Sequence, residues 1–230
     1  SKIAVGYTSG NLIFYNLETH EMLCAHKEHK SAITTLETTE ISMLLSTGRK
    51  SKKILLSGST EQDCSVLVWD LEIMEPMKRL SGHDHMISSI KAIDDNSTVF
   101  TSSFDCKIAA WDLSDNFNCI QVLEEHSTPI LCLDYNSEDH ILCSGSLDGI
   151  VAVWKVVYNS GAYHGCSLKN KIQLDGHVID LCRSNSLPQV LISLESDFQI
   201  RIYSVVSGSL LKTFSSEKPL IDFMIVEIQD

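Results

Sequence analysis

Four aromatic residues each close a strand-like run, and their spacing is the strongest constraint on the fold. They are Trp69, Trp111, Trp154 and Tyr203, at steps of 42, 43 and 49 residues. Each has an Asp six residues before it and a His further upstream, namely Asp63, Asp105, Asp148 and Asp197, and His29, His83, His126 and His177. A recurrence of about 40 to 45 residues that starts near Gly-His and ends at Trp-Asp is typical of a four-stranded propeller blade. We therefore expect an all-β protein, a β-propeller of four-stranded antiparallel blades.

The segment 82–124 shows the expected blade most clearly. Its apolar, β-rich runs are 86–93, 98–102, 107–112 and 119–123, and Asp, Asn and Ser separate the first two. Short β-rich runs between such turn residues indicate strands. The spacing divides 1–230 into a partial blade at 1–27, full blades at 28–81, 82–124, 125–175 and 176–215, and a lone first strand within 216–230.

The partial ends leave two arrangements open. Residues 2–26 resemble strands two to four of a blade, and 220–228 resemble a first strand alone. The last strand could complete the first blade and close a five-bladed ring, which would protect the sheet edges. Alternatively, the chain is an arc of a six- or seven-bladed ring. Larger rings are the commoner outcome for this repeat type, and the chain starts at Ser1 rather than Met, so we expect the arc.

Charge and cysteine content narrow the classes of partner. The formal net charge is −12, from 18 basic and 30 acidic side chains. Phosphate contacts from Lys and Arg dominate nucleic-acid affinity, so this balance disfavours nucleic acid as well as an anionic membrane. The sequence has no apolar run of about 18 residues, the length that a transmembrane helix needs. Eight Cys without a Cys-x-x-Cys pair indicate core thiols in a reducing compartment, hence a cytoplasmic or nuclear protein.

The repeat resembles the WD40-repeat family over nearly the whole chain. Its fullest statement is Ser144-Gly145-Ser146-Leu147-Asp148-Gly149, between a blade His and a Trp. The resemblance implies a hydrogen-bonded tetrad of His, Ser or Thr, Asp and Trp in each blade. The implied groups are His29, Ser57, Asp63 and Trp69; His83, Thr101, Asp105 and Trp111; His126, Ser144, Asp148 and Trp154; and His177, Ser193, Asp197 and Tyr203. The first blade departs from the pattern, with Ser9 in place of Asp and Tyr15 in place of Trp.

Two chemical readings of these residues compete with the structural one. His, Ser and Asp together form the triad of a hydrolase, but here the trio repeats four times, whereas a catalytic triad occurs once per site. Cys24, His26 and His29 have a spacing that zinc ligands use, but His29 has a tetrad place and no second half-site is visible. We therefore expect no catalytic residue, no metal site and no cofactor.

The resemblance also implies a partner-binding face, because family members often bind peptides at the loops around the central channel. The matching positions are Ala32, Thr34, Gln62, Met86, Ser88, Phe104, Pro129, Leu131, Leu147, Val178, Asp180 and Ser196; the last three assume a loop shorter by two residues. Six of them are apolar, and an exposed apolar patch tends to be a binding site. We expect Met86 and Phe104 to be the main anchors for protein partners with basic or apolar segments.

Two long insertions lie on the opposite face of the expected blades. Residues 46–53 contain a dense basic cluster, and residues 157–170 contain Gly161 and Gly165. We expect both to be solvated loops, because loops tolerate insertions; binding of an acidic partner or a lipid head group is the alternative.

The sequence thus predicts a non-enzymatic protein–protein interaction scaffold, or a substrate-recruitment module, within a larger multiprotein assembly. The alternative is the regulatory propeller of a multidomain enzyme, a kinase or ubiquitin ligase, whose catalytic part lies outside this chain.

Overall fold

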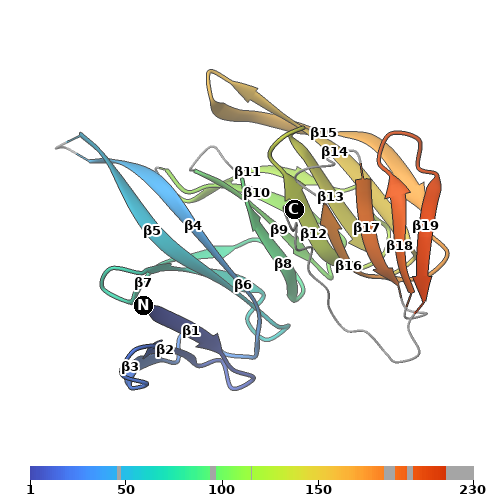
Figure 1. The fold of residues 1–230 in the computed structure, drawn as a ribbon. Coiled ribbons are helices and arrows are strands. Elements are labelled where there is room, and N and C mark those ends of the chain that lie inside the picture. Colours follow the sequence, from blue (N-terminus) through green and yellow to red (C-terminus); the bar gives the residue numbers. More distant parts are fainter. Residues whose placement is uncertain (46–47, 94–96, 115, 184–189, 196–198, 216–230) are drawn as a thin grey trace, which may run out of the picture. The chain divides into compact units, whose positions relative to one another are not determined.

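The protein is built from β-strands. The computed structural model describes residues 1–45, 48–93, 97–114, 116–183, 190–195 and 199–215 (Figure 1). These residues form nineteen strands and no α-helix. Consequently, none of them belongs to a helix long and apolar enough to cross a membrane. The predicted all-β fold of four-stranded antiparallel blades is confirmed.

The strands form two compact units, Ser1–Val122 and Leu123–Asp230. The first unit holds three sheets, and in each the strands follow one another in chain order. The first sheet is β1 (Lys2–Gly6), β2 (Leu12–Asn16) and β3 (Met22–His26), and the second is β4 (Ile33–Leu45), β5 (Gly48–Ser59), β6 (Ser65–Asp70) and β7 (Glu75–Ser81). The third is β8 (Ile87–Ala92), β9 (Thr98–Ser103), β10 (Ile108–Asp112) and β11 (Asn118–Leu123), and the last residue of β11 is the first residue of the second unit. Neighbouring strands such as β1 and β2, β5 and β6, and β8 and β9 pair antiparallel, as the alternation of strands and short turns requires.

The second unit holds two further four-stranded antiparallel sheets. They are β12 (Ile130–Asn136), β13 (Ile141–Ser146), β14 (Ile150–Asn159) and β15 (Ala162–Gln173), and β16 (Val178–Arg183), β17 (Val190–Glu195), β18 (Gln199–Ser204) and β19 (Leu210–Ser215). The expected strand at 220–228 lies outside the described residues. The choice between a closed ring and an arc therefore stays a prediction.

The four-stranded sheets share one register, which explains the aromatic period. In each, the aromatic of the third strand pairs with an apolar residue of the second: Trp69 with Leu55, Trp111 with Val99, Trp154 with Leu142 and Tyr203 with Leu191. In the second, third and fourth blades the tetrad Ser or Thr lies two residues further along the second strand, on the same face of the sheet. The aromatic residues recur in the sequence because the second and third strands pair in the same register in each of these sheets.

The hydrophobic core lies between neighbouring sheets. In the first unit, Trp69, Phe14 and Leu55 form a buried cluster between the first two sheets. A second cluster, which includes Leu56, Ile87 and Trp111, joins the next pair. In the second unit, Cys143, Val178 and Tyr203 belong to the cluster between its two sheets. Within each unit, neighbouring sheets therefore stabilise each other through a shared core.

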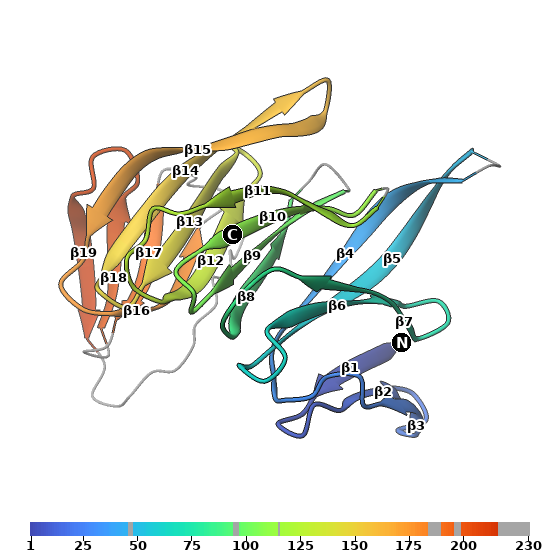
Figure 2. The same cartoon turned by 180° about the vertical axis from the view of Figure 1, so that it is seen from behind.

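The two insertions are paired strands, so the expectation of solvated loops is wrong. Residues 48–53 belong to β5, and β4 pairs with β5 as far as Leu45 and Gly48. β14 and β15 pair as far as Asn159 and Ala162, and each hairpin projects beyond its own sheet (Figure 2). Ser160 and Gly161 between them both have positive φ, the backbone of a tight two-residue hairpin turn. Backbone pairing makes an insertion a strand extension wherever both of its arms are long enough.

Candidate interaction site

The second-blade tetrad is a continuous chain of buried hydrogen bonds. The Trp69 indole N–H donates to Ser57 Oγ over 2.8 Å, and Ser57 Oγ lies 2.7 Å from His29 Nε2. His29 Nδ1 lies 2.6 Å from Asp63 Oδ2. Trp69 and Ser57 are fully buried and His29 is 1% exposed. Each buried polar group therefore has a partner, as a low-dielectric core requires.

The charges in this tetrad follow from its environment. Burial raises the pKa of Asp63, but hydrogen bonds from His29, Ser65 and Arg79 outweigh it and lower the pKa to about 2. Burial lowers the pKa of His29, against the opposing hydrogen bond and charge of Asp63. At pH 7 a neutral His29 thus donates Nδ1–H to the Asp63 carboxylate and accepts the Ser57 hydroxyl proton at Nε2.

Arg79 is a further member that the sequence analysis did not identify. Its Nη1 donates to Asp63 Oδ1 over 2.5 Å and to Ser65 Oγ over 2.6 Å, and its Nη2 donates to the Glu28 carbonyl over 2.6 Å. Arg79 lies on β7, the outermost strand of the sheet, and reaches back to the segment that precedes β4. An Arg just before the end of a blade, in a chain of net charge −12, was the available signal.

The third blade repeats the arrangement, and the fourth blade changes it. His83 lies 2.8 Å from Thr101 Oγ1 and 2.7 Å from Asp105 Oδ2, and Trp111 donates to Thr101 over 2.8 Å. In the fourth blade His126 and Trp154 both meet Ser144 Oγ, at 2.7 Å and 2.8 Å. Asp148 instead accepts from Ser146 Oγ over 2.6 Å and acts on His126 through its charge.

The fifth blade departs from the expected tetrad. In the second, third and fourth blades the His lies four residues before the Ile that begins the first strand. In the fifth blade, His177 directly precedes Val178, the first residue of β16. His177 is exposed, and its Nδ1 is hydrogen-bonded to the Leu147 carbonyl. Thus His177 does not occupy the buried His position. Tyr203 is buried, while Asp197 and the side chain of Ser193 lie outside the described residues.

A cavity of about 610 Å³ opens where the loops of the first three sheets meet. Its lining comes from the β1–β2 turn (Thr8 and Ser9), from residues 30–32 before β4, from residues 60–62 after β5, and from Met86 before β8. We call it the loop cavity. Ala32, Gln62 and Met86 are partner-binding positions that the sequence predicted, and all three line it.

The second-blade tetrad holds in place the two loops that line the loop cavity. His29 and Asp63 directly flank residues 30–32 and 60–62, and the Lys30 main-chain N–H donates to Asp63 Oδ2 over 3.3 Å. Ser31 Oγ donates to the Thr60 carbonyl over 3.1 Å, and the Thr60 N–H donates to the Ala32 carbonyl over 3.0 Å. The buried network therefore positions both loops, without a side chain of the tetrad reaching the cavity.

Comparison with known proteins identifies the repeat. The family model "WD domain, G-beta repeat" matches residues 74–112 and 117–155. The chain thus carries WD40 repeats at these two positions. Similar proteins include the transcriptional corepressor LEUNIG_HOMOLOG of Arabidopsis thaliana, 26% identical over 102 residues, and the autophagy-related protein 16 of the same plant, 27% identical over 153 residues. The nuclear distribution protein nudF of Aspergillus flavus is 28% identical over 104 residues.

These matches cover parts of larger WD40-repeat proteins. They span 44%, 65% and 44% of this chain, but only 13%, 28% and 22% of the respective relatives. WD40-repeat proteins typically act as non-enzymatic scaffolds that bind other proteins. The likeness therefore supports the repeat and the general scaffold role.

Phe104, Thr34 and Ser88 are the other predicted partner-binding residues of the first unit, and none of them lines the loop cavity. Phe104 is half-buried, and its N–H donates to the Met86 carbonyl over 3.0 Å. Thr34 and Ser88 lie at a β-bulge in the first strand of their sheets. The Thr34 hydroxyl contacts the Ile87 carbonyl at 2.6 Å and Ser88 Oγ lies 2.9 Å from Ser102 Oγ, so both hydroxyls already have partners within the protein.

In the second unit the predicted residues divide between surface and core. Leu147 is 41% exposed, Pro129 and Leu131 are half-buried, and Val178 is fully buried. Val178 therefore cannot belong to an exposed patch, and this prediction is wrong. The register gives the reason: the bulge in β16 falls between Val178 and Asp180, so Ile179 takes the position assigned to Asp180. Ser196 lies outside the described residues, and a single ring of all these side chains stays a prediction.

The zinc alternative has no support in the residues that the structure describes. None of their His, Cys, Asp and Glu side chains form a group of three or more that could hold a metal ion. His29 is committed to Ser57 and Asp63, and the Cys24 thiol points toward the Met74 carbonyl at 4.0 Å.

Proposed function

We propose that this chain is a protein-interaction scaffold that binds a segment of a partner protein in the loop cavity. The observation that carries the proposal is the meeting of three consecutive sheets around one cavity, with Ala32, Gln62 and Met86 in its lining. Its volume of about 610 Å³ falls in the range of about 300 to 1,000 Å³ that ligand pockets occupy.

The lining suits an extended peptide. Thr8, Ser9, Ser31 and Thr60 bring hydroxyls, and Gln62 brings an exposed amide, so the wall offers donors and acceptors to a peptide backbone. Met86 adds a flexible apolar contact that adapts to different side chains. The tetrad keeps the loops in place before a partner arrives, and preorganisation of this kind reduces the entropic cost of binding.

A photocrosslinking experiment tests the site. A photoreactive phenylalanine analogue at Gln62 should crosslink a protein partner in cells, and the same analogue at Ile73, which is 64% exposed in the β6–β7 turn, should not. Met86→Ala should reduce the crosslink at position 62, because the substitution removes the apolar anchor without touching the tetrad. Equal crosslinking at positions 62 and 73, or an unchanged yield in Met86→Ala, would contradict the proposal.

The partner is expected to be a protein of the same compartment, cytoplasmic or nuclear. The acidic net charge of −12 favours partner segments that carry basic residues, mainly through the rate of encounter. A partner captured at position 62 would also decide whether the chain serves a multiprotein scaffold or the regulatory part of an enzyme.

A further inference from the structure

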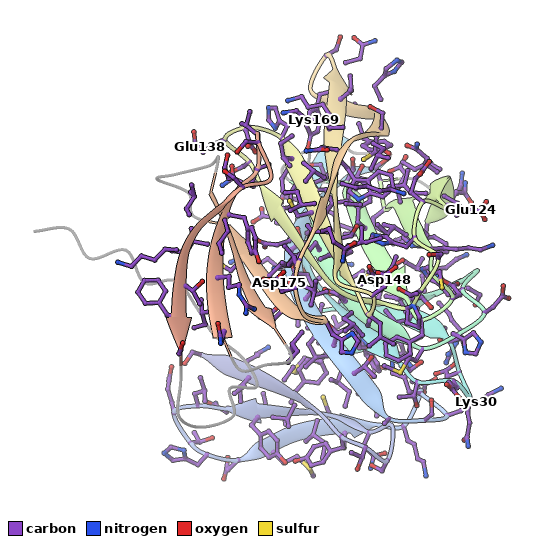
Figure 3. All side chains as sticks on the ribbon, turned by 90° about the vertical axis from the view of Figure 1, so that its right-hand side faces the viewer. Lys30, Glu124, Glu138, Asp148, Lys169 and Asp175 are labelled. Atoms are coloured by element: carbon purple, nitrogen blue, oxygen red, sulfur yellow. The ribbon has the colours of Figure 1, made fainter. Side chains whose placement is uncertain are left out.

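A second groove, in the unit 123–230, differs from the loop cavity in chemistry. It measures about 520 Å³ and is lined by Asp139, Ile141, Lys155, Ser167, Leu168, Lys169, Val205 and Val206. We call it the hairpin groove, because β14 and β15 supply both lysines. Figure 3 shows Lys169 at the opposite end of this unit from Asp148 and Asp175. The hairpin groove therefore lies away from the loops that carry the predicted partner positions.

The position of Lys169 results from a β-bulge. Val153 pairs with Asn170 and Trp154 pairs with Leu168, so Lys169 is the extra residue. The same bulge occurs in three other outermost strands, where the extra residue is Leu23, Met77 or Leu211. A bulge bends the strand and redirects its side chain. Only at this bulge among the four does the redirected side chain carry a charge.

The groove combines an apolar wall with positive charge. Val206 is 60% exposed and Leu168 is 37% exposed, while Ile141 and Val205 are buried beneath them. Lys155 Nζ donates to the Asp139 carbonyl over 2.7 Å, which is a bond to a neutral group. Among the described residues, no carboxylate forms an ion pair with Lys155 or Lys169. The one carboxylate of the lining, Asp139, accepts the Ile141 N–H over 3.2 Å.

We propose that the hairpin groove binds a short acidic segment of a partner protein. An aliphatic side chain of the segment would rest on Leu168 and Val206, and carboxylates on either side of it would pair with Lys155 and Lys169. The argument for this occupant is charge complementarity on a concave apolar surface. This inference is independent of the function proposed for the loop cavity.

Other anionic partners fit the groove less well. Nucleic acid needs several phosphate contacts and stacking surfaces, whereas this groove offers two lysines and aliphatic side chains within a chain of net charge −12. An anionic membrane would be repelled by the same net charge. A peptide carboxylate needs only the local positive field that Lys155 and Lys169 provide.

A peptide selection followed by a binding measurement tests the proposal. Short random peptides displayed on phage would be selected on the immobilised chain, and the most enriched acidic peptide would be synthesised with a fluorescent label. We expect Asp and Glu around a Leu, Ile or Val. In fluorescence anisotropy, the double variant Lys155→Glu/Lys169→Glu should bind this peptide at least about tenfold more weakly. Higher salt should reduce the difference, because both lysines are exposed.

Lys212→Glu is the matched control, since Lys212 is exposed on the outermost strand of the neighbouring sheet and stacks on Phe214 at 5.1 Å. It should leave peptide binding unchanged, and thermal melting should show that all variants fold. A selection that enriches peptides but no acidic peptide among them, or equal binding of the acidic peptide by the double variant, would overturn the proposal. The proposal would also be overturned if the selection enriched no peptide while the wild-type chain bound phosphatidylserine vesicles and the double variant did not. A membrane would then be the occupant of the groove.

Discussion

Gly58 and Ile87 are in contact across two neighbouring sheets. A Cβ atom on Gly58 would lie 2.7 Å from Ile87 Cγ2, closer than carbon atoms approach. The same relationship joins Gly6 to Ile33, at 2.7 Å, and Gly145 to Val178. Each glycine follows the second-strand position that the tetrad Ser holds in the full blades. The motif Ser-Gly therefore serves two purposes: the Ser closes the tetrad, and the Gly admits the β-branched side chain of the next sheet.

Gly58→Ala should destabilise the protein by about 1 to 3 kcal/mol, because the added methyl group overpacks a close contact. Ile87→Ala removes the opposing methyl group, so the double variant should lose less stability than the sum of the two single changes. Urea denaturation followed by tryptophan fluorescence would measure all three variants. Strict additivity would show that the two residues do not press on each other.

Ser57→Ala should cost about 1 to 3 kcal/mol, because it leaves the buried Trp69 N–H and His29 Nε2 without a partner. Ser81→Ala is the control, since Ser81 is exposed on β7 of the same sheet; it should change stability by less than about 0.5 kcal/mol. Urea denaturation would measure the free energy of unfolding of both variants. A Ser57→Ala protein as stable as Ser81→Ala would mean that the tetrad does not support the blade.

Arg79→Lys should be destabilising although it keeps the charge. Arg79 contacts Asp63, Ser65 and the Glu28 carbonyl from two guanidinium nitrogens, and a single ammonium group cannot reproduce this fork. We expect a loss of about 1 kcal/mol in thermal denaturation, less than for a buried ion pair, because the side chain is 34% exposed. Retention of full stability would show that charge alone suffices.

The protein should lose stability as the pH falls from about 6.5 to 4, with His126 as one source. Burial lowers the pKa of His126 to about 4, the charge of Asp148 opposes this, and Lys171 adds to it. Between these pH values the unfolded chain binds a proton that the folded chain excludes, so stability is present above pH 6.5 and declines below it. The lowered pKa of His29 acts in the same direction. Asp63, with a pKa of about 2 against 3.8 ordinarily, contributes a separate loss below about pH 4.

Thermal melting at pH 7 and pH 4.5 checks this expectation. His126→Gln should narrow the difference between the two melting temperatures, whereas His164→Gln, an exposed residue of β15, should not. The same pH dependence in wild type and His126→Gln would assign the acid sensitivity to other groups.

Much of the fold was predictable because its signals are local. The spacing of Trp69, Trp111 and Trp154 follows from one register repeated in successive sheets, and strand alternation around a short turn needs no distant partner. The tetrad groupings at His29 and His83 were predictable for the same reason, since a fixed register brings fixed spacings together.

The errors arise where pairing between segments decides the outcome. Residues 46–53 and 157–170 carry loop-like composition, but their arms are long enough to pair as hairpins. Val178 was counted one position out because the loop before β16 is shorter by three residues and not by two: His177 lies one residue before its strand, whereas the other blade histidines lie four residues before theirs. Arg79 was missed because its partners lie 16 and 51 residues away.

By itself the sequence determined the strand period, the tetrads of the second and third blades and the net charge of −12. Only the tertiary structure decided that the loops of three sheets line one open cavity, that Val178 is buried against Gly145, and that Lys169 shares a groove with Val206. The physical reason is that a strand and its turn are encoded over a few residues, whereas a cavity depends on how separate sheets pack. That packing is governed by side-chain volume and register, which one strand cannot specify for its neighbour.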